Sequence, residues 1–200
     1  MARAPSIETL GVVLVGCRLQ RPRARVGRGG LVVLAPPLGT APLTIFTSIY
    51  ALASPGHRMA NGVVLLVAGL VVERRTTWLR FHLYFVAVGA LAGIAQVVLG
   101  GLIGPPNAVL GASGAVFGLV GYLLAGNTVS ATLRDRIRLS PRVQVVLYAV
   151  AALAVTLATG RPGIALIAHF TGLFVGLLAG AVGLLDTGSG ETEATSVLQG

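Results

Sequence analysis

The strongest constraint on the fold is a series of separate apolar stretches, each close to the length of a membrane-spanning helix. They cover residues 57–73, 81–102, 143–159 and 164–185, with a shorter stretch at 111–126. A helix needs about 20 apolar residues to cross the hydrocarbon core, and only helices and closed barrels satisfy all their backbone groups there. The pattern predicts an all-α fold, a polytopic helical membrane bundle.

The composition supports this prediction. The chain is 54% hydrophobic and 10% charged, whereas a soluble domain is about 25% charged. Many of the 28 glycines fall inside the apolar stretches, where small residues let membrane helices approach closely. We therefore expect a multi-pass integral membrane protein, located in the cell membrane and surrounded by the lipid bilayer.

The charges indicate the topology rather than a nucleic-acid partner. All 15 basic residues are arginines, giving a formal charge of +9, and they cluster between the apolar stretches. The basic loops 73–80 and 134–142 are separated by two apolar stretches, so both lie on one side of the membrane, which the positive-inside rule assigns to the cytoplasm.

The chain has a single cysteine, Cys17, which excludes an intrachain disulfide.

The sequence divides into three parts. Residues 1–36 are expected to form a poorly defined N-terminus, because the apolar segment Ile7–Cys17 is too short to span and several arginines follow it. Residues 37–185 form the membrane domain, which begins with a proline-broken loop containing short helical pieces. Residues 186–200 are polar and mildly acidic, and are expected to form a loose tail.

One short segment carries a candidate nucleophile. In Gly111–Leu119, with the sequence GASGAVFGL, Ser113 lies between glycines at the start of an apolar stretch. An unpaired buried hydroxyl costs about 1–3 kcal/mol, so the serine either hydrogen-bonds to its own helix or has a chemical role. As a nucleophile it needs a base, and the chain has three histidines.

His169 is the histidine best placed to be that base. It lies about 8 Å below the outer end of the last apolar stretch, at 1.5 Å per residue. Gly172 and Gly176 follow it on one helical face, and Gly114 follows Ser113. Facing glycines allow two helices to approach closely enough for a Ser–His hydrogen bond, although ordinary helix packing uses the same pattern.

A second polar pair opens the stretch at 57–73. His57 and Asn61 are four residues apart and share a helical face. Their side chains and the Ser113 backbone N–H are candidates for stabilising an oxyanion, while the alternative is an ordinary interfacial histidine at a helix start. His82 lies at the opposite membrane face and is expected to be interfacial.

These motifs together resemble the rhomboid family of intramembrane serine proteases. The matching segments are GASGAVFGL, AHFTGLFVG at Ala168–Gly176, and HRMAN at His57–Asn61 with Glu73 twelve residues after Asn61. The resemblance covers residues 43–185. It implies a rhomboid-like six-helix fold, here with a degenerate first helix.

The resemblance also implies a function. It implies a serine endopeptidase that cleaves transmembrane segments of membrane proteins with a dyad of Ser113 as nucleophile and His169 as general base and acid. His57, Asn61 and the Ser113 N–H would form the oxyanion hole, without metal or cofactor. The supporting residues would be Phe117, packed against the histidine, and Gly111, Gly114, Gly172 and Gly176.

Two other functions remain open from the sequence. One is a catalytically impaired rhomboid-like protein that only binds membrane-protein clients. The other is a small transporter or channel, for which we would expect paired intramembrane charges or an internal repeat. The sequence shows neither of these features.

Overall fold

The computed structural model describes residues 4–24, 32–51, 54–104, 108–160 and 165–187, with side chains left undescribed at 17–24 and 135. The described residues are helical, without a named β-strand, which confirms the all-α prediction. The elements are α1 (Pro5–Ala24), η2 (Leu38–Thr40), α2 (Thr44–Thr47), η3 (Ser48–Tyr50), α3 (Pro55–Val72), α4 (Trp78–Ile103), α5 (Ser113–Ala125), α6 (Thr128–Ile137), α7 (Pro141–Thr159) and α8 (Leu166–Ala181).

The helices agree with the apolar stretches. By length and composition α3, α4 and α7 can each cross a membrane, and α5 with part of α6 would make a fourth span bent by 59°. The apolar helix α8 is shorter, as is the apolar part of α1 at Pro5–Gly16. The prediction of a multi-pass integral membrane protein is confirmed.

The structure adds one helix that we had expected to be a loop. Helix α6 begins where the Asn127 side chain accepts a hydrogen bond from the Ser130 N–H, and ends at Arg138 with a left-handed φ of 47°. The proline-broken segment before α3 contains short helical pieces, as expected. The tail expected at 186–200 lies outside the described residues from 188 onward.

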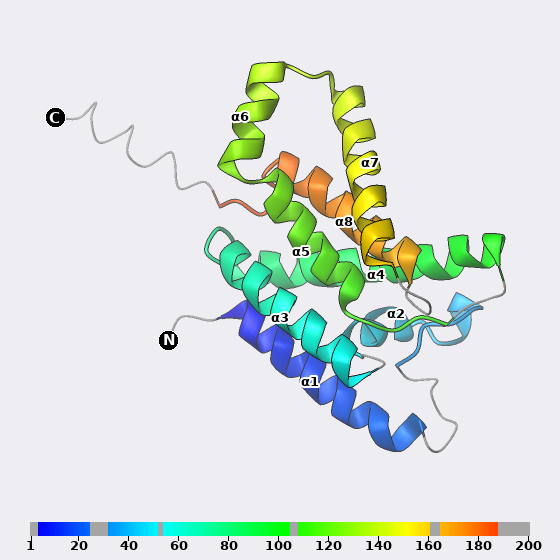
Figure 1. Ribbon diagram of the computed structural model, residues 1–200. Coiled ribbons are helices and arrows are strands. Elements are labelled where there is room, and N and C mark those ends of the chain that lie inside the picture. Colours follow the sequence, from blue (N-terminus) through cyan, green and yellow to red (C-terminus); the bar gives the residue numbers. More distant parts are fainter. Residues whose placement is uncertain (1–3, 25–31, 52–53, 105–107, 161–164, 188–200) are drawn as a thin grey trace.

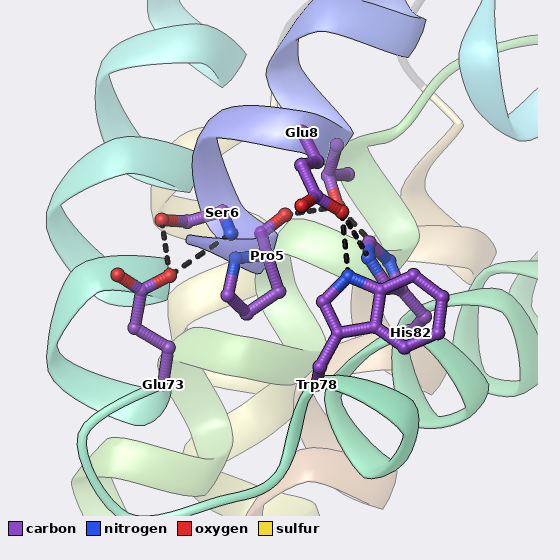
Figure 2. A network of polar contacts seen from close by, with 7 residues as sticks. Pro5, Ser6, Glu8, Glu73, Trp78 and His82 are labelled. Atoms are coloured by element: carbon purple, nitrogen blue, oxygen red, sulfur yellow. Dashed lines mark hydrogen bonds and ion pairs between the residues drawn. The ribbon is translucent and has the colours of Figure 1, made fainter. Parts of the chain in front are cut away.

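The N-terminal part contains the helix α1, which packs against α3 (Figure 1). Its first turn is bound to the α3–α4 connection (Figure 2). The Glu73 carboxylate accepts hydrogen bonds from the Ser6 N–H at 3.0 Å and from its hydroxyl at 2.6 Å. Glu8 accepts a hydrogen bond from the Trp78 indole and lies 3.4 Å from His82 Nε2. The side chain of His82, predicted to be interfacial, therefore contacts the polar start of α1.

One end of the bundle gathers the arginine-containing connections, and we call it the basic end. Arg75 donates a hydrogen bond to the carbonyl of Gly126 after α5, and its own carbonyl accepts one from the N–H of Thr187 after α8. The ends of α3, α5 and α8 and the start of α4 therefore meet there. Because α3, α5 and α8 run towards the basic end, their first residues lie at the opposite end.

Helix α5 occupies the centre of the bundle. It contacts α3, α4 and α8, and Figure 1 shows it crossing between α3 and α8. The hydroxyl of Tyr84 on α4 donates a hydrogen bond to the Gly118 carbonyl at 2.9 Å and is buried. In contrast, α7 contacts chiefly α8, and only Ala152 and Thr156 of its residues are buried.

Candidate active site

Helices α5 and α8 are in direct backbone contact. A methyl group added to Gly172 would lie 2.0 Å from the carbonyl oxygen of Gly114, and one added to Gly176 would lie 2.3 Å from that of Gly118. Further along, Gly180 approaches the carbonyl of Tyr122 in the same way, at 2.2 Å. No side chain can be inserted at these contacts, so the glycines fix the spacing of the two helices.

Ser113 is the first residue of α5 and is 6% exposed. The chain reaches it through Gly111, whose φ of 141° strongly favours glycine and whose N–H donates a hydrogen bond to the Ser48 carbonyl. Helix α5 has 13 residues and is about 20 Å long, whereas the hydrocarbon core is about 30 Å thick. With the other end of α5 at the basic end, Ser113 lies below the opposite membrane surface.

His169 lies in the first turns of α8, beside the start of α5. Its ring stacks on that of Phe117, with centroids 4.4 Å apart and planes 23° apart. A methyl group added to Gly114 would lie 3.4 Å from the carbonyl of Ala168, the residue before the histidine. These contacts bring His169 to the turn of α5 that begins with Ser113, and the histidine is itself 6% exposed.

The hydrogen bond that we expected between the serine and the histidine is not formed in the structure. Both ring nitrogens of His169 are buried, and neither has a hydrogen-bond partner among the described residues. Catalytic hydrogen bonds are often long or poorly aligned in the absence of substrate. A buried imidazole without a partner also costs free energy, so the site is not optimised for stability.

The candidate oxyanion residues are placed differently from each other. His57 is half-buried in the first turn of α3. The Asn61 side chain donates a hydrogen bond to the His57 carbonyl at 2.9 Å, one turn earlier in its own helix. One N–H of the Asn61 amide is therefore already used, and the other is left for a ligand.

One polar residue near the site was missed from the sequence. Gln96 lies in the second half of α4, and its side-chain oxygen accepts a hydrogen bond from the Ala168 N–H at 3.1 Å. The first N–H groups of a helix have no intrahelical partner, so Gln96 satisfies one of them next to His169. The sequence contained a sign of this role, because a single side-chain amide inside a long apolar stretch is costly unless it has a hydrogen-bond partner.

A small cavity adjoins the serine. Its volume is about 10 Å³, near the lower limit for a single water molecule. The walls include Ser48, Gly111, Ser113, Gly114 and Ala168.

Among the described residues, no group of three or more His, Cys, Asp or Glu side chains comes together that could hold a metal ion. The polar chemistry near Ser113 therefore comes from hydroxyl, imidazole, amide and backbone groups.

The sequence of the chain matches a known protein family. A model of the rhomboid domain matches residues 40–185, which is more than half of the chain. The chain belongs to the rhomboid family. It is also 32% identical over 130 residues to RHOMBOID-like protein 4 of Arabidopsis thaliana. That alignment covers 64% of this rhomboid chain and 31% of the plant protein, so the chain spans about a third of its relative's length.

Proposed function

We propose that this rhomboid-family protein is an intramembrane serine endopeptidase that cleaves transmembrane segments of membrane proteins. The observation that carries the proposal is the placement of the His169 ring against Phe117, one turn beyond Ser113, across a glycine contact. A serine hydroxyl is a weak nucleophile until a neighbouring base takes its proton. Among the described residues, His169 on the facing helix is the candidate base, because its ring stacks on Phe117 in the first turns of α5.

In the proposed reaction, the Ser113 oxygen attacks the carbonyl carbon of the scissile peptide while His169 takes the hydroxyl proton. The negative charge develops on the carbonyl oxygen, where the Ser113 N–H, His57 and the free N–H of Asn61 would stabilise it. His169 then returns the proton to the departing amine, which leaves an acyl-enzyme. A water molecule, deprotonated by the same histidine, hydrolyses the ester and regenerates the serine.

The substrate must lose helical structure before this chemistry can occur. In a membrane helix every backbone carbonyl is hydrogen-bonded within the segment, and the side of the helix shields it. We therefore expect substrates with small or helix-breaking residues at the cut. Replacing these residues with leucine should reduce cleavage at least about tenfold, as measured by gel analysis of a reconstituted substrate; unchanged turnover would contradict the unwinding step.

The second candidate is a rhomboid-like protein that binds clients without cleaving them. Two observations favour it: the Ser113–His169 hydrogen bond is not formed, and the Asn61 amide is partly occupied by its own helix. Such a protein would keep the helix packing and the client-binding surface. It would neither hydrolyse a substrate nor react with a mechanism-based serine inhibitor.

A cleavage assay with matched variants distinguishes the two functions. Purified protein and a model transmembrane substrate are reconstituted together, and wild type is compared with Ser113→Ala and His169→Ala. Ser130→Ala and His82→Gln are the matched controls, because both lie away from the start of α5. We expect loss of cleavage only in the first pair, and labelling of wild type by a fluorophosphonate probe that Ser113→Ala abolishes.

Cleavage that survives either Ser113→Ala or His169→Ala would remove the dyad. Absence of both cleavage and probe labelling in folded wild type, with the client still co-purifying, would favour the non-catalytic function. Circular dichroism and gel filtration of each variant show whether it is folded, so a loss of activity by misfolding is recognised directly.

A further inference from the structure

A long apolar groove lies on the outside of the bundle, between α4 and the end of α8. Its volume is about 550 Å³, within the range of small-ligand sites. The α4 side of its wall includes Arg80, Leu83, Ala87 and Leu91, and the α8 side includes Val175 and Ala179. Arg80 lies at the basic end of the bundle, opposite the end that carries Ser113, so the mouth of the groove is separate from the candidate active site.

The length of the groove matches one leaflet of a bilayer. From Arg80 to Leu91 the helix α4 rises about 16 Å at 1.5 Å per residue, and half of a hydrocarbon core is about 15 Å. A transmembrane helix of a partner protein would need a groove about twice as long. The dimensions therefore fit a lipid acyl chain, which is the most abundant apolar molecule around this surface.

Arg80 gives the groove a charged mouth. Its side chain is exposed, and it donates one hydrogen bond, at 3.3 Å, to the backbone carbonyl of Asp186. The Asp186 carboxylate accepts a hydrogen bond from Tyr122 instead, and no described carboxylate forms an ion pair with Arg80. A guanidinium has five N–H donors, so most of those on Arg80 are left for an anion.

The neighbouring charges reinforce this preference. Arg74 and Arg75 are exposed in the same connection between α3 and α4, while Glu73 is bound to Ser6. An anionic headgroup near this connection meets three arginines and two neighbouring carboxylates, those of Glu73 and Asp186, that are already hydrogen-bonded. Basic clusters beside apolar grooves at this membrane depth select anionic over zwitterionic lipids.

We propose that this groove binds one anionic phospholipid, with its phosphate on Arg80 and one acyl chain between α4 and α8. The lipid would bridge the start of α4 to the end of α8, two elements that Arg80 already links through the Asp186 carbonyl. The site is independent of the proposed peptidase activity. Its occupant is a lipid rather than free phosphate, because the apolar groove contributes nothing to the binding of an inorganic ion.

Fluorescence quenching by brominated lipids tests the site in the intact protein. Trp78 is the chain's single tryptophan, so a Trp78→Phe background allows one reporter to be placed at will. Leu83→Trp puts the reporter at the groove, at a position that is 60% exposed. Val67→Trp is the matched control: it is 64% exposed on α3, six residues before the same basic connection begins at Glu73, and does not line the groove.

Each reporter protein is reconstituted in mixtures of brominated phosphatidylglycerol and brominated phosphatidylcholine. At Leu83→Trp we expect phosphatidylglycerol to bind about fivefold more strongly than phosphatidylcholine, the factor for one arginine near the membrane surface. Adding Arg80→Gln should reduce this preference to the value at Val67→Trp. Arg142→Gln, which removes an exposed arginine at the start of α7, should leave it unchanged.

Filling the groove provides a second variant that does not alter charge. Ala87→Phe places a ring at an exposed position of the groove wall, and should lower quenching by both lipids at Leu83→Trp. Equal preference for phosphatidylglycerol at the two reporters, or a preference that survives Arg80→Gln, would overturn the proposal. Failure of both lipids to quench Leu83→Trp in folded protein would also overturn it, and would show that protein covers the groove.

Discussion

Helix α8 has two neighbours, α5 and α7, that it contacts in very different ways. Against α5 the contact is backbone on backbone, with three glycines of α8 facing carbonyls of α5. Against α7 the contact is made by side chains, and only Ala152 and Thr156 of α7 are buried. The candidate residues Ser113 and His169 lie on the first pair, so the proposed chemistry would take place where two helix backbones are in direct contact.

The loosely packed helix α7 has the opposite properties. Most of its surface faces outward, and a groove of about 530 Å³ separates parts of it from α4 and α8. Elements with few buried contacts open most readily. The same molecule thus combines a closely packed helix pair, which would hold the proposed catalytic geometry, with an outer helix that has few buried residues.

The largest expected effect comes from breaking the rigid pair. Gly172→Ala places a methyl group 2.0 Å from the Gly114 carbonyl, so the helices must separate. We expect a loss of about 3 kcal/mol or more of unfolding free energy, measured by denaturation in detergent micelles. Gly101→Ala is the control, because a methyl group there meets nothing within 4 Å; equal stability of both variants would contradict the tight contact.

A smaller loss is expected when the start of α8 is released from α4. Gln96→Leu removes the acceptor of the Ala168 N–H and leaves that donor unpaired. The expected cost is about 1–3 kcal/mol in the same denaturation measurement. Gln144→Leu is the control for replacing a glutamine with leucine away from the start of α8, because the Gln144 amide donates a hydrogen bond to the Leu139 carbonyl at the basic end. Its effect on the unfolding free energy should be below about 0.5 kcal/mol.

On the loosely packed side we expect a gain. The Thr156 hydroxyl is buried without a hydrogen-bond partner in the described structure, so Thr156→Val removes an unsatisfied group at nearly constant shape. Unfolding free energy should rise by about 1 kcal/mol. Thr159→Val, whose hydroxyl bonds to the Val155 carbonyl, should instead show no gain. A loss of stability in Thr156→Val would indicate a partner for that hydroxyl.

The smallest effect is expected at the outward face of α7. Leu153 is 50% exposed, and lipid tails replace whatever contact the shortened side chain loses. Leu153→Ala should therefore change the unfolding free energy by less than about 0.5 kcal/mol. A change comparable to that of Gln96→Leu would mean that α7 is held as firmly as α5, and the contrast between the two neighbours of α8 would disappear.

Several parts of the fold could be predicted from the sequence. The apolar stretches gave the approximate bounds of α3, α4, α5, α7 and α8, because the length and composition of a membrane helix follow directly from the bilayer. Helix α6 was missed, since it is short and polar and is set by its Asn127 cap. The N-terminal segment forms helix α1, whose first turn is bonded to Glu73, a contact with a residue far along the chain.

For the candidate site, the sequence supplied the residues and their order, and the family relation was readable from three motifs. The packing of Phe117 against His169 was already implied by the family resemblance. Only the tertiary structure decided that Asn61 turns to its own helix and that Gln96 holds the start of α8. The physical reason is that hydrophobicity specifies which segments enter the membrane. The pairing of their faces depends on contacts between residues far apart in the chain, and here it is fixed by glycines that let two backbones touch.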